Sequence, residues 1–314
     1  MTGAVLGIDI GGSKTNGVRA EIGSDTAATV LAEATVGSAS MSSVGATEAA
    51  RQLDILLSRL GTSGVQAVCV GAAGVDTPEA ETRLLLLVRE RFPAVPVRVV
   101  HDTHLVLAAA GLITGAVGIS GTGSAAWGRN SEGQHWRASG WGYLLGDEGS
   151  AYGVIRAALR HVLDRADNDV PADLLTRELT RSCSVESTSE LLDLFYKTPS
   201  RREWAAKASL VFALAEASDP VCLDIVHGAA TELVRAVTRV CRKLGLAGPV
   251  VLAGGVAVHQ PLLQTAVTAG LHSAGIDNVR VLYRDPVHGA VELARALLAG
   301  HGGSQSQSQP APAE

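Results

Sequence analysis

Two glycine-rich stretches of the chain predict its fold: GIDIGGSKTNG at residues 7–17 and GISGTGSAAWG at residues 118–128. Aligned without gaps at an offset of 111 residues, they are identical at five of eleven positions. In each stretch apolar residues run into a glycine turn and polar alternation resumes after it, which is typical of a strand, a tight turn and a second strand. Two copies of one hairpin indicate a duplicated domain.

Further matches extend the duplication. Residues 46–73 align with residues 230–257 at an offset of 184, and VRVV at 97–100 matches VRVL at 279–282. The first of these pairs begins with apolar residues at helical spacing and ends in a short buried strand followed by glycines. The rise of the offset from 111 to 184 places 73 additional residues in the second copy, around 130–210. We therefore expect an α/β fold with a hairpin-containing mixed sheet in each half.

The composition of the chain argues against several classes of protein. The 314 residues carry 26 Lys and Arg against 31 Asp and Glu, a net charge of −5 without a basic run, which argues against a nucleic-acid partner. No apolar stretch reaches the roughly 20 residues of a membrane span, and the start MTGAVLGIDIGG lacks the pattern of a signal peptide. The four cysteines form no CxxC pair, which disfavours a disulfide framework, a zinc site or an iron–sulfur cluster. We expect a soluble cytoplasmic protein without a membrane partner.

The two glycine turns are candidates for gripping a phosphate chain from both sides. Glycine lets backbone N–H groups approach phosphate oxygens, and nearby hydroxyls add donors. Neither turn is a P-loop or a dinucleotide fingerprint, because a strand follows the first and the spacing of the second departs from GxGxxG. A plain hairpin turn is the alternative for each. The candidate nucleotide-binding residues are Gly11, Gly12, Ser13, Lys14 and Thr15 in the first turn and Thr122, Gly123 and Ser124 in the second.

A third glycine element, LAGGVAV at 252–258, follows the pattern of a buried strand that ends at Gly254 and Gly255. The absence of side chains there suits a flat ligand such as adenine with its ribose. A close-packed turn from strand to helix explains the same glycines equally well.

Two aspartates follow strands and are candidates for phosphoryl-transfer chemistry. Asp102, in HDTH at 101–104, comes directly after the strand VRVV at the junction of the halves, where a base that accepts the proton of an alcohol is expected. The alternative role of Asp102 is the N-cap of the helix that follows. Asp9, at the end of the first strand, is the candidate magnesium ligand, because magnesium is often held by one or two carboxylates plus phosphates.

The additional residues of the second copy contain SGWGYLLGDEGS at 139–150. Asp147 and Glu148 would accept hydrogen bonds from sugar hydroxyls, with Trp141 or Tyr143 as apolar walls, a composition typical of a polyol pocket. The alternative is that one of the two acids caps the helix starting near Tyr152. Nearly half of the 11 aromatic residues of the chain lie in this neighbourhood, which indicates a binding wall or a local core.

Together these motifs resemble the BadF-type ATPase family of the actin-like ATPase superfamily, and within it the N-acetylglucosamine kinase-like members, above all the actinobacterial glucosamine kinases. The most specific part is GGWG followed by GDEGS, here with Ser139 in place of the first glycine. The resemblance implies a duplicated ribonuclease-H-like fold of two domains with an interdomain cleft. We expect an N-terminal domain of residues 1–104 plus 288–300, a C-terminal domain of residues 105–287, and a disordered tail at 301–314.

The resemblance also implies roles for individual residues. Asp102 would remove the proton of the sugar O6, Asp147 would hold sugar hydroxyls, and Gly254 and Gly255 would face adenosine. ATP would be the co-substrate, Mg²⁺ the metal and a small-molecule amino sugar the partner, and a homodimer is compatible with the sequence. The residues expected to bind the sugar are Asp102, Thr122, Gly123, Gly140, Trp141, Asp147 and Glu148.

The substrate follows from a departure from the family pattern. Relatives that act on acetylated sugars often have an Asn in the loop after the third strand, whereas this chain has GSASMSS at 37–43. We therefore expect D-glucosamine to be phosphorylated at O6, with Asp102, Asp147 and Glu148 favouring its cationic amine. N-acetylglucosamine is the alternative substrate. A more distant alternative is an ATPase activator of a radical dehydratase or reductase, which needs an iron–sulfur cluster held by cysteines.

Overall fold

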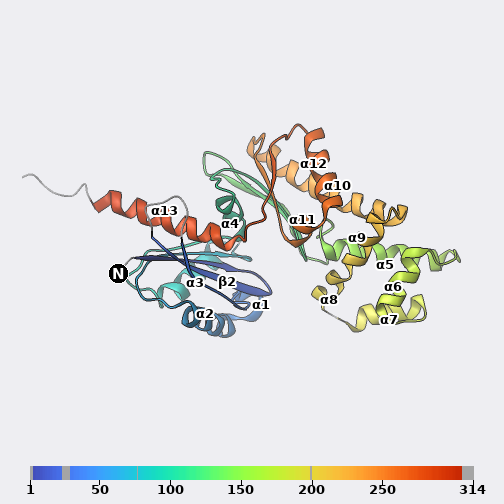
Figure 1. Cartoon of the computed structure of the whole chain (residues 1–314), viewed down its shortest axis with the longest axis horizontal. Helices are drawn as coiled ribbons and strands as arrows, with labels where there is room; N and C mark the ends of the chain where they lie inside the picture. Colours follow the sequence, from blue (N-terminus) through green and yellow to red (C-terminus); the bar gives the residue numbers. More distant parts are fainter. Residues whose placement is uncertain (1–2, 23–28, 76, 199, 306–314) are drawn as a thin grey trace, which may run out of the picture. The chain divides into compact units, whose positions relative to one another are not determined.

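The computed structural model describes residues 3–22, 29–75, 77–198 and 200–305. The chain divides into two compact units (Figure 1). The first unit contains the residues up to Ile113 and those from Arg284 onward, and the second contains Thr114–Tyr283. Each unit is built on one five-stranded sheet.

The sheet of the first unit has the strand order β3-β2-β1-β4-β5. The strands β1 (Ala4–Ile10), β2 (Lys14–Glu21) and β3 (Val30–Gly37) form an antiparallel meander. The strands β4 (Val65–Ala72) and β5 (Val97–His101) continue the sheet in parallel with β1. The carboxyl ends of β1, β4 and β5 therefore lie at one edge, where both predicted aspartates are found.

Helices cover both faces of this sheet because the strand residues alternate in direction. Leu6 and Ile8 belong to one buried cluster with residues of α2 and α3, whereas Val5 belongs to another with residues of α4 and α13. The helices of the first unit are α1 (Met41–Val44), α2 (Ala46–Leu60), α3 (Pro78–Arg89), α4 (Asp102–Ala109) and α13 (Val287–Gln305).

The second unit repeats this topology, with the strand order β10-β9-β6-β7-β8. Its antiparallel meander consists of β6, β7 and β8, and β9 and β10 run parallel to β6. The strands are β6 (Gly115–Ser120), β7 (Ser124–Arg129), β8 (His135–Ser139), β9 (Val250–Ala253) and β10 (Val279–Val281). The helices α10 (Pro220–Leu244), α11 (Gly255–His259) and α12 (Pro261–Ser273) complete the repeat.

One contact shows how closely the two copies agree. A Cβ on Gly17 of β2 would lie 2.6 Å from Leu60 of α2, and a Cβ on Gly128 of β7 would lie 3.1 Å from Leu244 of α10. Gly17 and Gly128 are partners at the offset of 111, and Leu60 and Leu244 are partners at the offset of 184. Residues that are paired by the two separate alignments thus make the equivalent contact in each unit. This agreement confirms the predicted duplicated α/β fold.

The additional residues of the second copy form five helices between β8 and α10. Because β8 is the counterpart of β3, this insertion occupies residues 140–219 and starts later than the expected 130–210. The helices are α5 (Ala151–Asp167), α6 (Leu174–Cys183), α7 (Thr188–Lys197), α8 (Arg201–Ala206) and α9 (Ala208–Glu216).

The limits of the two units differ from the expected ones. A boundary at 104 would cut α4, which continues to Ala109, so the first unit extends to Ile113 and resumes at Arg284. The expected tail at 301–314 also starts too early, because α13 continues to Gln305, and residues 306–314 lie outside the described residues. Among the helices described, none is both long and apolar enough to cross a membrane.

Candidate active site

The glycine turn of the first unit is a tight hairpin between β1 and β2. The N–H of Gly11 donates to the carbonyl of Lys14 at 2.9 Å, so the turn closes over Gly12 and Ser13. Gly12, Ser13 and Lys14 are exposed, and the atom nearest to a Cβ on Gly12 would be Ser43 Oγ at 3.6 Å. This turn leaves open space above its backbone, as the binding of a phosphate chain requires.

Thr15 lies differently from the other predicted residues of this turn. Its side chain is fully buried, and its Oγ1 accepts a hydrogen bond from the N–H of Ala39 at 2.8 Å. Ser38 Oγ donates to the carbonyl of Gly11 at 2.8 Å. The structure therefore uses Thr15 and Ser38 to tie the serine-rich segment after β3 to the glycine turn.

Asp9 lies near the end of β1, opposite Asn16 of β2 in the sheet register. Burial and the negative charges of Asp102 and Asp285 raise the pKa of Asp9, Lys14 lowers it, and the net result is a pKa of about 7. The first unit thus crowds three carboxylates together, and the carboxyl group of Asp9 holds a proton well above its usual range.

Asp102 follows β5 and is the first residue of α4. The N-cap of α4 is His101, whose ring accepts from the N–H of Thr103, so the alternative of Asp102 as the cap is wrong. The Oδ1 of Asp102 is buried and accepts no hydrogen bond, although it lies 2.9 Å from Nδ1 of His101. The Asp102 side chain as a whole is 29% exposed, so part of this carboxylate faces solvent after the end of the strand.

Asp285 was not identified from the sequence. Its Oδ2 accepts from Nδ2 of Asn16 at 3.2 Å, and its Oδ1 accepts from the N–H of Val287 at the start of α13. The signal in the sequence, an Asp followed by Pro before a helical pattern, is typical of a turn. Only the packing of α13 on the first sheet brings this residue beside Asn16, 269 positions away.

The second unit gathers three glycine-rich segments at the carboxyl ends of β6 and β9. A Cβ on Gly121 would lie 3.8 Å from the N atom of Gly255, and one on Gly254 would lie 2.4 Å from the carbonyl oxygen of Ser120. Gly254 has a φ of 94°, which also requires glycine. The carbonyl of Gly121 accepts from the N–H of Ala151 at 2.9 Å, which joins this turn to the GDEGS loop.

Asp147 is the centre of this arrangement. Its side chain is almost completely buried, and its Oδ1 accepts from the N–H of Ser124 at 3.1 Å. Burial raises the pKa of Asp147, and the Ser124 N–H and the charge of Arg201 partly offset this effect. A Cβ on Gly123 would lie only 2.9 Å from Asp147 Oδ2, so this carboxylate occupies the space that the glycine leaves.

The two acids of the loop have arginine partners, and neither acid caps α5. The N-cap of α5 is Ser150, whose Oγ accepts from the N–H of Gly153. Glu148 is paired with Arg156 at 3.2 Å, and Arg201 lies 3.8 Å from Asp147. The expected excess of negative charge for a cationic amine is therefore compensated in this unit.

The aromatic residues of the loop differ in exposure. Trp141 is 64% exposed, with the guanidinium of Arg137 at 4.9 Å from its ring, and it follows Gly140, whose φ is 73°. Tyr152 is buried and packs edge-on against Tyr143 at 5.4 Å between ring centroids. Trp127 is buried in β7. Trp141 thus presents a free apolar face, whereas Tyr152 and Trp127 support the structure.

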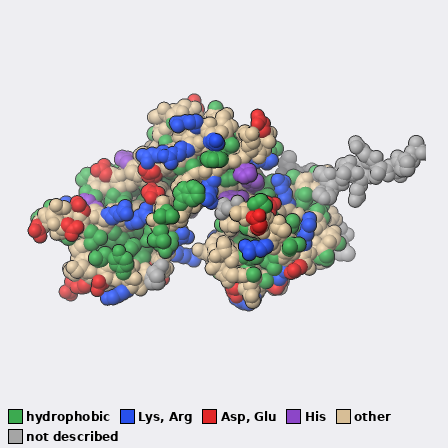
Figure 2. Space-filling view, turned by 180° about the vertical axis from the view of Figure 1, so that it is seen from behind, with side chains coloured by type: hydrophobic (Ala, Val, Ile, Leu, Met, Phe, Trp, Pro, Cys, Tyr) green, Lys and Arg blue, Asp and Glu red, His purple; other side chains and the backbone are tan. Residues whose placement is uncertain are grey.

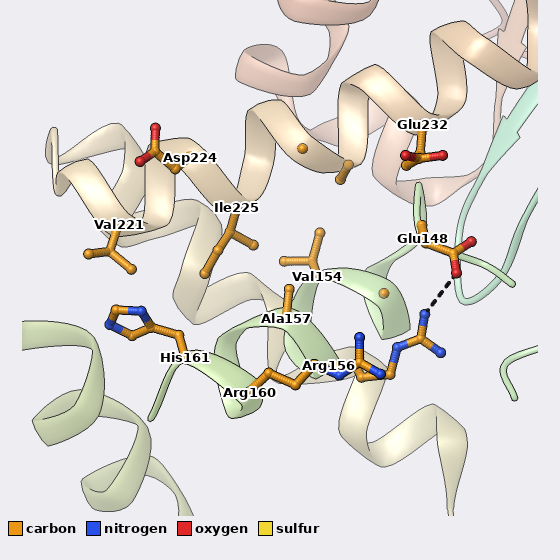
Figure 3. Close-up of a pocket in the computed structure, with 13 residues that line it drawn as sticks. Glu148, Val154, Arg156, Ala157, Arg160, His161, Val221, Asp224, Ile225 and Glu232 are labelled. Atoms are coloured by element: carbon orange, nitrogen blue, oxygen red, sulfur yellow. Dashed lines mark hydrogen bonds and ion pairs between the residues drawn. The ribbon is translucent and has the colours of Figure 1, made fainter. Parts of the chain in front are cut away.

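A cavity of about 620 Å³ lies between α5 and α10 in the second unit (Figure 3). Val154, Ala157 and Ile225 form its apolar part, and Figure 3 shows Glu148 turned toward Arg156 at one end. The glycine turns and Asp147 do not line this cavity. On the face seen in Figure 2, basic and acidic side chains are interspersed.

The cysteines do not favour an iron–sulfur protein. Cys69, Cys222 and Cys241 are buried, and burial raises the pKa of their thiols to between about 11 and about 12. In the described part of the chain, no group of three or more His, Cys, Asp or Glu side chains is arranged to hold a metal ion.

The duplicated sheet with its paired glycine turns is the fold of a class of ATP-using proteins. The chain belongs to the BadF/BadG/BcrA/BcrD ATPase family, whose sequence profile matches residues 6–294. This finding confirms the resemblance and supports ATP as the co-substrate.

Two relatives share about a third of their residues with the chain. An N-acetylmuramic acid/N-acetylglucosamine kinase of Clostridium acetobutylicum is 31% identical over 264 residues, 80% of this chain and 85% of the relative. An N-acetyl-D-glucosamine kinase of Dictyostelium discoideum is 31% identical over 243 residues, 73% of this chain and 75% of the relative. The predicted class, an amino-sugar kinase, agrees with both names.

Solved structures show the same fold at lower identity. A Porphyromonas gingivalis protein, named as a candidate N-acetylglucosamine kinase, has a TM-score of 0.73 at 20% identity and covers 93% of this chain and 99% of its own. A ROK family glucokinase from Streptomyces griseus has a TM-score of 0.59 at 18% identity, with 94% and 99% covered.

Proposed function

We propose that this protein is an ATP-dependent kinase that transfers the γ-phosphoryl group of ATP to O6 of an N-acetylated amino sugar. The observation that carries the proposal is the position of the Asp102 carboxylate, which is 29% exposed directly after the end of β5, with Oδ1 2.9 Å from Nδ1 of His101. Phosphoryl transfer needs a group that accepts the proton of the attacking hydroxyl, and a partly exposed carboxylate is suited to do so. The names of the two relatives support a sugar as the alcohol.

The glycine turns account for the nucleotide. The exposed backbone of Gly12 and Ser13 and the side chain of Lys14 would bind phosphate oxygens. In the second unit, Thr122 and the backbone of Gly123 would take part in phosphate binding, and the surface of Gly254 and Gly255 would receive adenosine. Thr15 would hold the first turn in shape from behind, because its hydroxyl is bonded to Ala39.

Asp9 is the carboxylate of the first unit that would bind a magnesium ion. Asp9 is enclosed, and burial together with the negative charges of Asp102 and Asp285 raises its pKa to about 7. One carboxylate suits a hard divalent cation whose other ligands are phosphate oxygens and water. Asp9 would hold the ion, which when bound would neutralise charge on the phosphate chain.

The sugar would bind to the carboxylate of Asp147. Its Oδ2 makes no hydrogen bond, so it is available to a sugar hydroxyl, while the Ser124 N–H holds Oδ1 in place. Trp141 would cover one face of the sugar ring, and Glu148, paired with Arg156, would lie farther from it.

Two features support the acetylated sugar over glucosamine, the substrate first expected. The compensation of Asp147 and Glu148 by arginines weakens the attraction for an amine. The segment at 37–43 also has exposed hydroxyl side chains at Ser42 and Ser43, so an acetamide group would have hydrogen-bonding partners without an Asn.

The test is a coupled ADP assay on the purified protein with ATP, Mg²⁺ and one sugar at a time. We expect kcat/KM for N-acetylglucosamine to exceed that for glucosamine by about tenfold or more, the size of one well-placed polar contact. Glucose and mannosamine serve as controls for the C2 substituent. A preference for glucosamine would reject the acetylated substrate, and no ADP above the sugar-free blank with any sugar would reject the kinase.

A further inference from the structure

The backbone of Asp147 has an unusual conformation. Its φ is 65°, in the left-handed region that residues other than glycine rarely adopt. Such a conformation is strained, so it persists only where the surrounding contacts hold it. Because Asp147 is the residue that would bind the sugar, its backbone conformation decides where its carboxylate points.

Hydrogen bonds hold the peptide groups on both sides of the Asp147 Cα. The carbonyl of Gly146 accepts from Nη2 of Arg156 at 3.1 Å. The carbonyl of Asp147 itself accepts from Oγ of Ser150 at 2.6 Å and from the N–H of Ser150 at 3.1 Å. The orientations of these two peptide groups set φ and ψ of Asp147, so Arg156 and Ser150 together fix its conformation.

Arg156 holds the loop at two further points. It donates to the carbonyl of Tyr143, and its Nη2 lies 3.2 Å from a carboxylate oxygen of Glu148 (Figure 3). The Arg156 side chain is only 18% exposed, so these charge-assisted hydrogen bonds are largely shielded from water. A planar guanidinium bonds several acceptors in fixed directions. Arg156 thus joins the residues before and after Asp147.

The helix α5 gives this arrangement a rigid base. Arg156 belongs to α5, and Ser150 is its N-cap. A Cβ on Gly153, in the first turn of α5, would lie 2.4 Å from the carbonyl oxygen of Asp147, so the helix lies directly against the loop backbone. The ion pair with Glu148 does not by itself explain Arg156, because Glu148 is 48% exposed and such pairs contribute little to stability.

We propose that Arg156 is a positioning residue for the sugar, holding Asp147 in its left-handed conformation so that Oδ2 faces the sugar hydroxyls. This inference rests on the proposed kinase function and on sugar binding at Asp147. In the parts of the chain that the structure describes, all hydrogen bonds of Arg156 go to residues 143–148. Loss of Arg156 should therefore weaken binding of the sugar and spare binding of the nucleotide.

The kinetic experiment uses the full chain with ATP, Mg²⁺ and N-acetylglucosamine. Arg156→Gln should lower kcat/KM for the sugar by about 10- to 100-fold, chiefly through KM, because a small displacement of a binding group is enough for a loss of this size. The Kd of a non-hydrolysable ATP analogue should change by less than about threefold. Arg156→Lys keeps the charge but not the planar set of donors, so its loss should be smaller.

A second measurement does not depend on activity. Hydrogen exchange followed by mass spectrometry should show faster exchange of the amides of residues 141–149 in Arg156→Gln than in the wild type, with β6 and β7 unchanged. Arg160→Gln is the matched control. Arg160 lies one turn farther along α5, is exposed and makes no hydrogen bond within the described residues, so this variant should leave KM and exchange unaffected.

The outcomes separate this inference from the function on which it rests. A wild-type KM for the sugar in Arg156→Gln, or unchanged exchange of the loop, would overturn the role of Arg156 and leave the kinase intact. An equal loss of affinity for sugar and nucleotide would also overturn it, because it would indicate general destabilisation. If Arg156→Gln does not fold, Arg156→Lys decides by the same criteria. No turnover of the sugar by the wild type would overturn both proposals.

Discussion

The two glycine turns descend from the same repeated hairpin, yet they use the same glycine differently. A Cβ on Gly12 would have its nearest neighbour at 3.6 Å, whereas a Cβ on Gly123 would meet Asp147 Oδ2 at 2.9 Å. In the first unit, the space beside Gly12 is open to a ligand. In the second unit, the carboxylate of Asp147 from the insertion fills the equivalent space beside Gly123.

The charges around the two turns differ in the same way. In the first unit, the negative charges of Asp102 and Asp285 raise the pKa of Asp9, and the positive charge of Lys14 only partly opposes them. In the second unit Asp147 and Glu148 each have an arginine. The comparison teaches that the first unit is arranged to receive a cation and phosphates, and the second to receive a polar ligand without an excess of charge.

The largest effect is expected from Asp102→Asn. Removal of the proton acceptor should lower kcat by a factor of about 10² to 10⁴, the usual contribution of a general base. Affinity for a non-hydrolysable ATP analogue should stay close to that of the wild type. Asp193→Asn, on exposed α7, is the matched control and should keep full activity. Full turnover by Asp102→Asn would show that the base lies elsewhere.

A pair of alanine substitutions tests the comparison of the turns directly. Gly123→Ala should lose about 1–3 kcal/mol of unfolding free energy and most of its activity, because its Cβ displaces Asp147. Gly12→Ala should keep its Tm, since the space is free, but lose activity because its Cβ enters the phosphate site. Thermal unfolding and kcat/KM are measured for both variants and for the wild type. Equal Tm losses in both variants would contradict the difference between the turns.

The smallest effects concern pH. The folded-state pKa of Asp9, about 7, lies above the ordinary value of 3.8, so the folded state binds more protons between these pH values and stability falls as pH rises through them. Asp9→Asn should therefore raise Tm at pH 7.5 in the absence of ligands and flatten its pH dependence above pH 4.

Asp173 of the insertion is the matched opposite case. Burial raises its pKa, but hydrogen bonds from Thr176 and His161 outweigh this effect and bring the pKa to about 2. Its contribution is present above about pH 4 and is lost toward pH 2, so Asp173→Asn should lower Tm at pH 7.5. A shift of the same sign in Asp9→Asn and Asp173→Asn would contradict the electrostatic comparison.

Local signals explain what could be predicted. The repeat, the hairpins at 7–17 and 118–128 and the long helices follow from periodicity and glycine turns, which act over a few residues. The capping residues were harder to predict, because His101 and Ser150 compete with neighbouring acids for the same backbone N–H groups. Periodicity does not decide which of two adjacent polar side chains points back at the helix.

The sequence by itself determined the duplicated sheet, the family, the positions of Asp9 and Asp102 near the ends of strands, and the position of Asp147 in the insertion. Only the tertiary structure decided which charges accompany them. Asp285, just before α13, lies beside Asn16 although the two residues are 269 positions apart. Arg201 lies near Asp147 although it follows it by 54 residues. Electrostatic interactions depend on distance in space, whereas a sequence pattern records only distance along the chain.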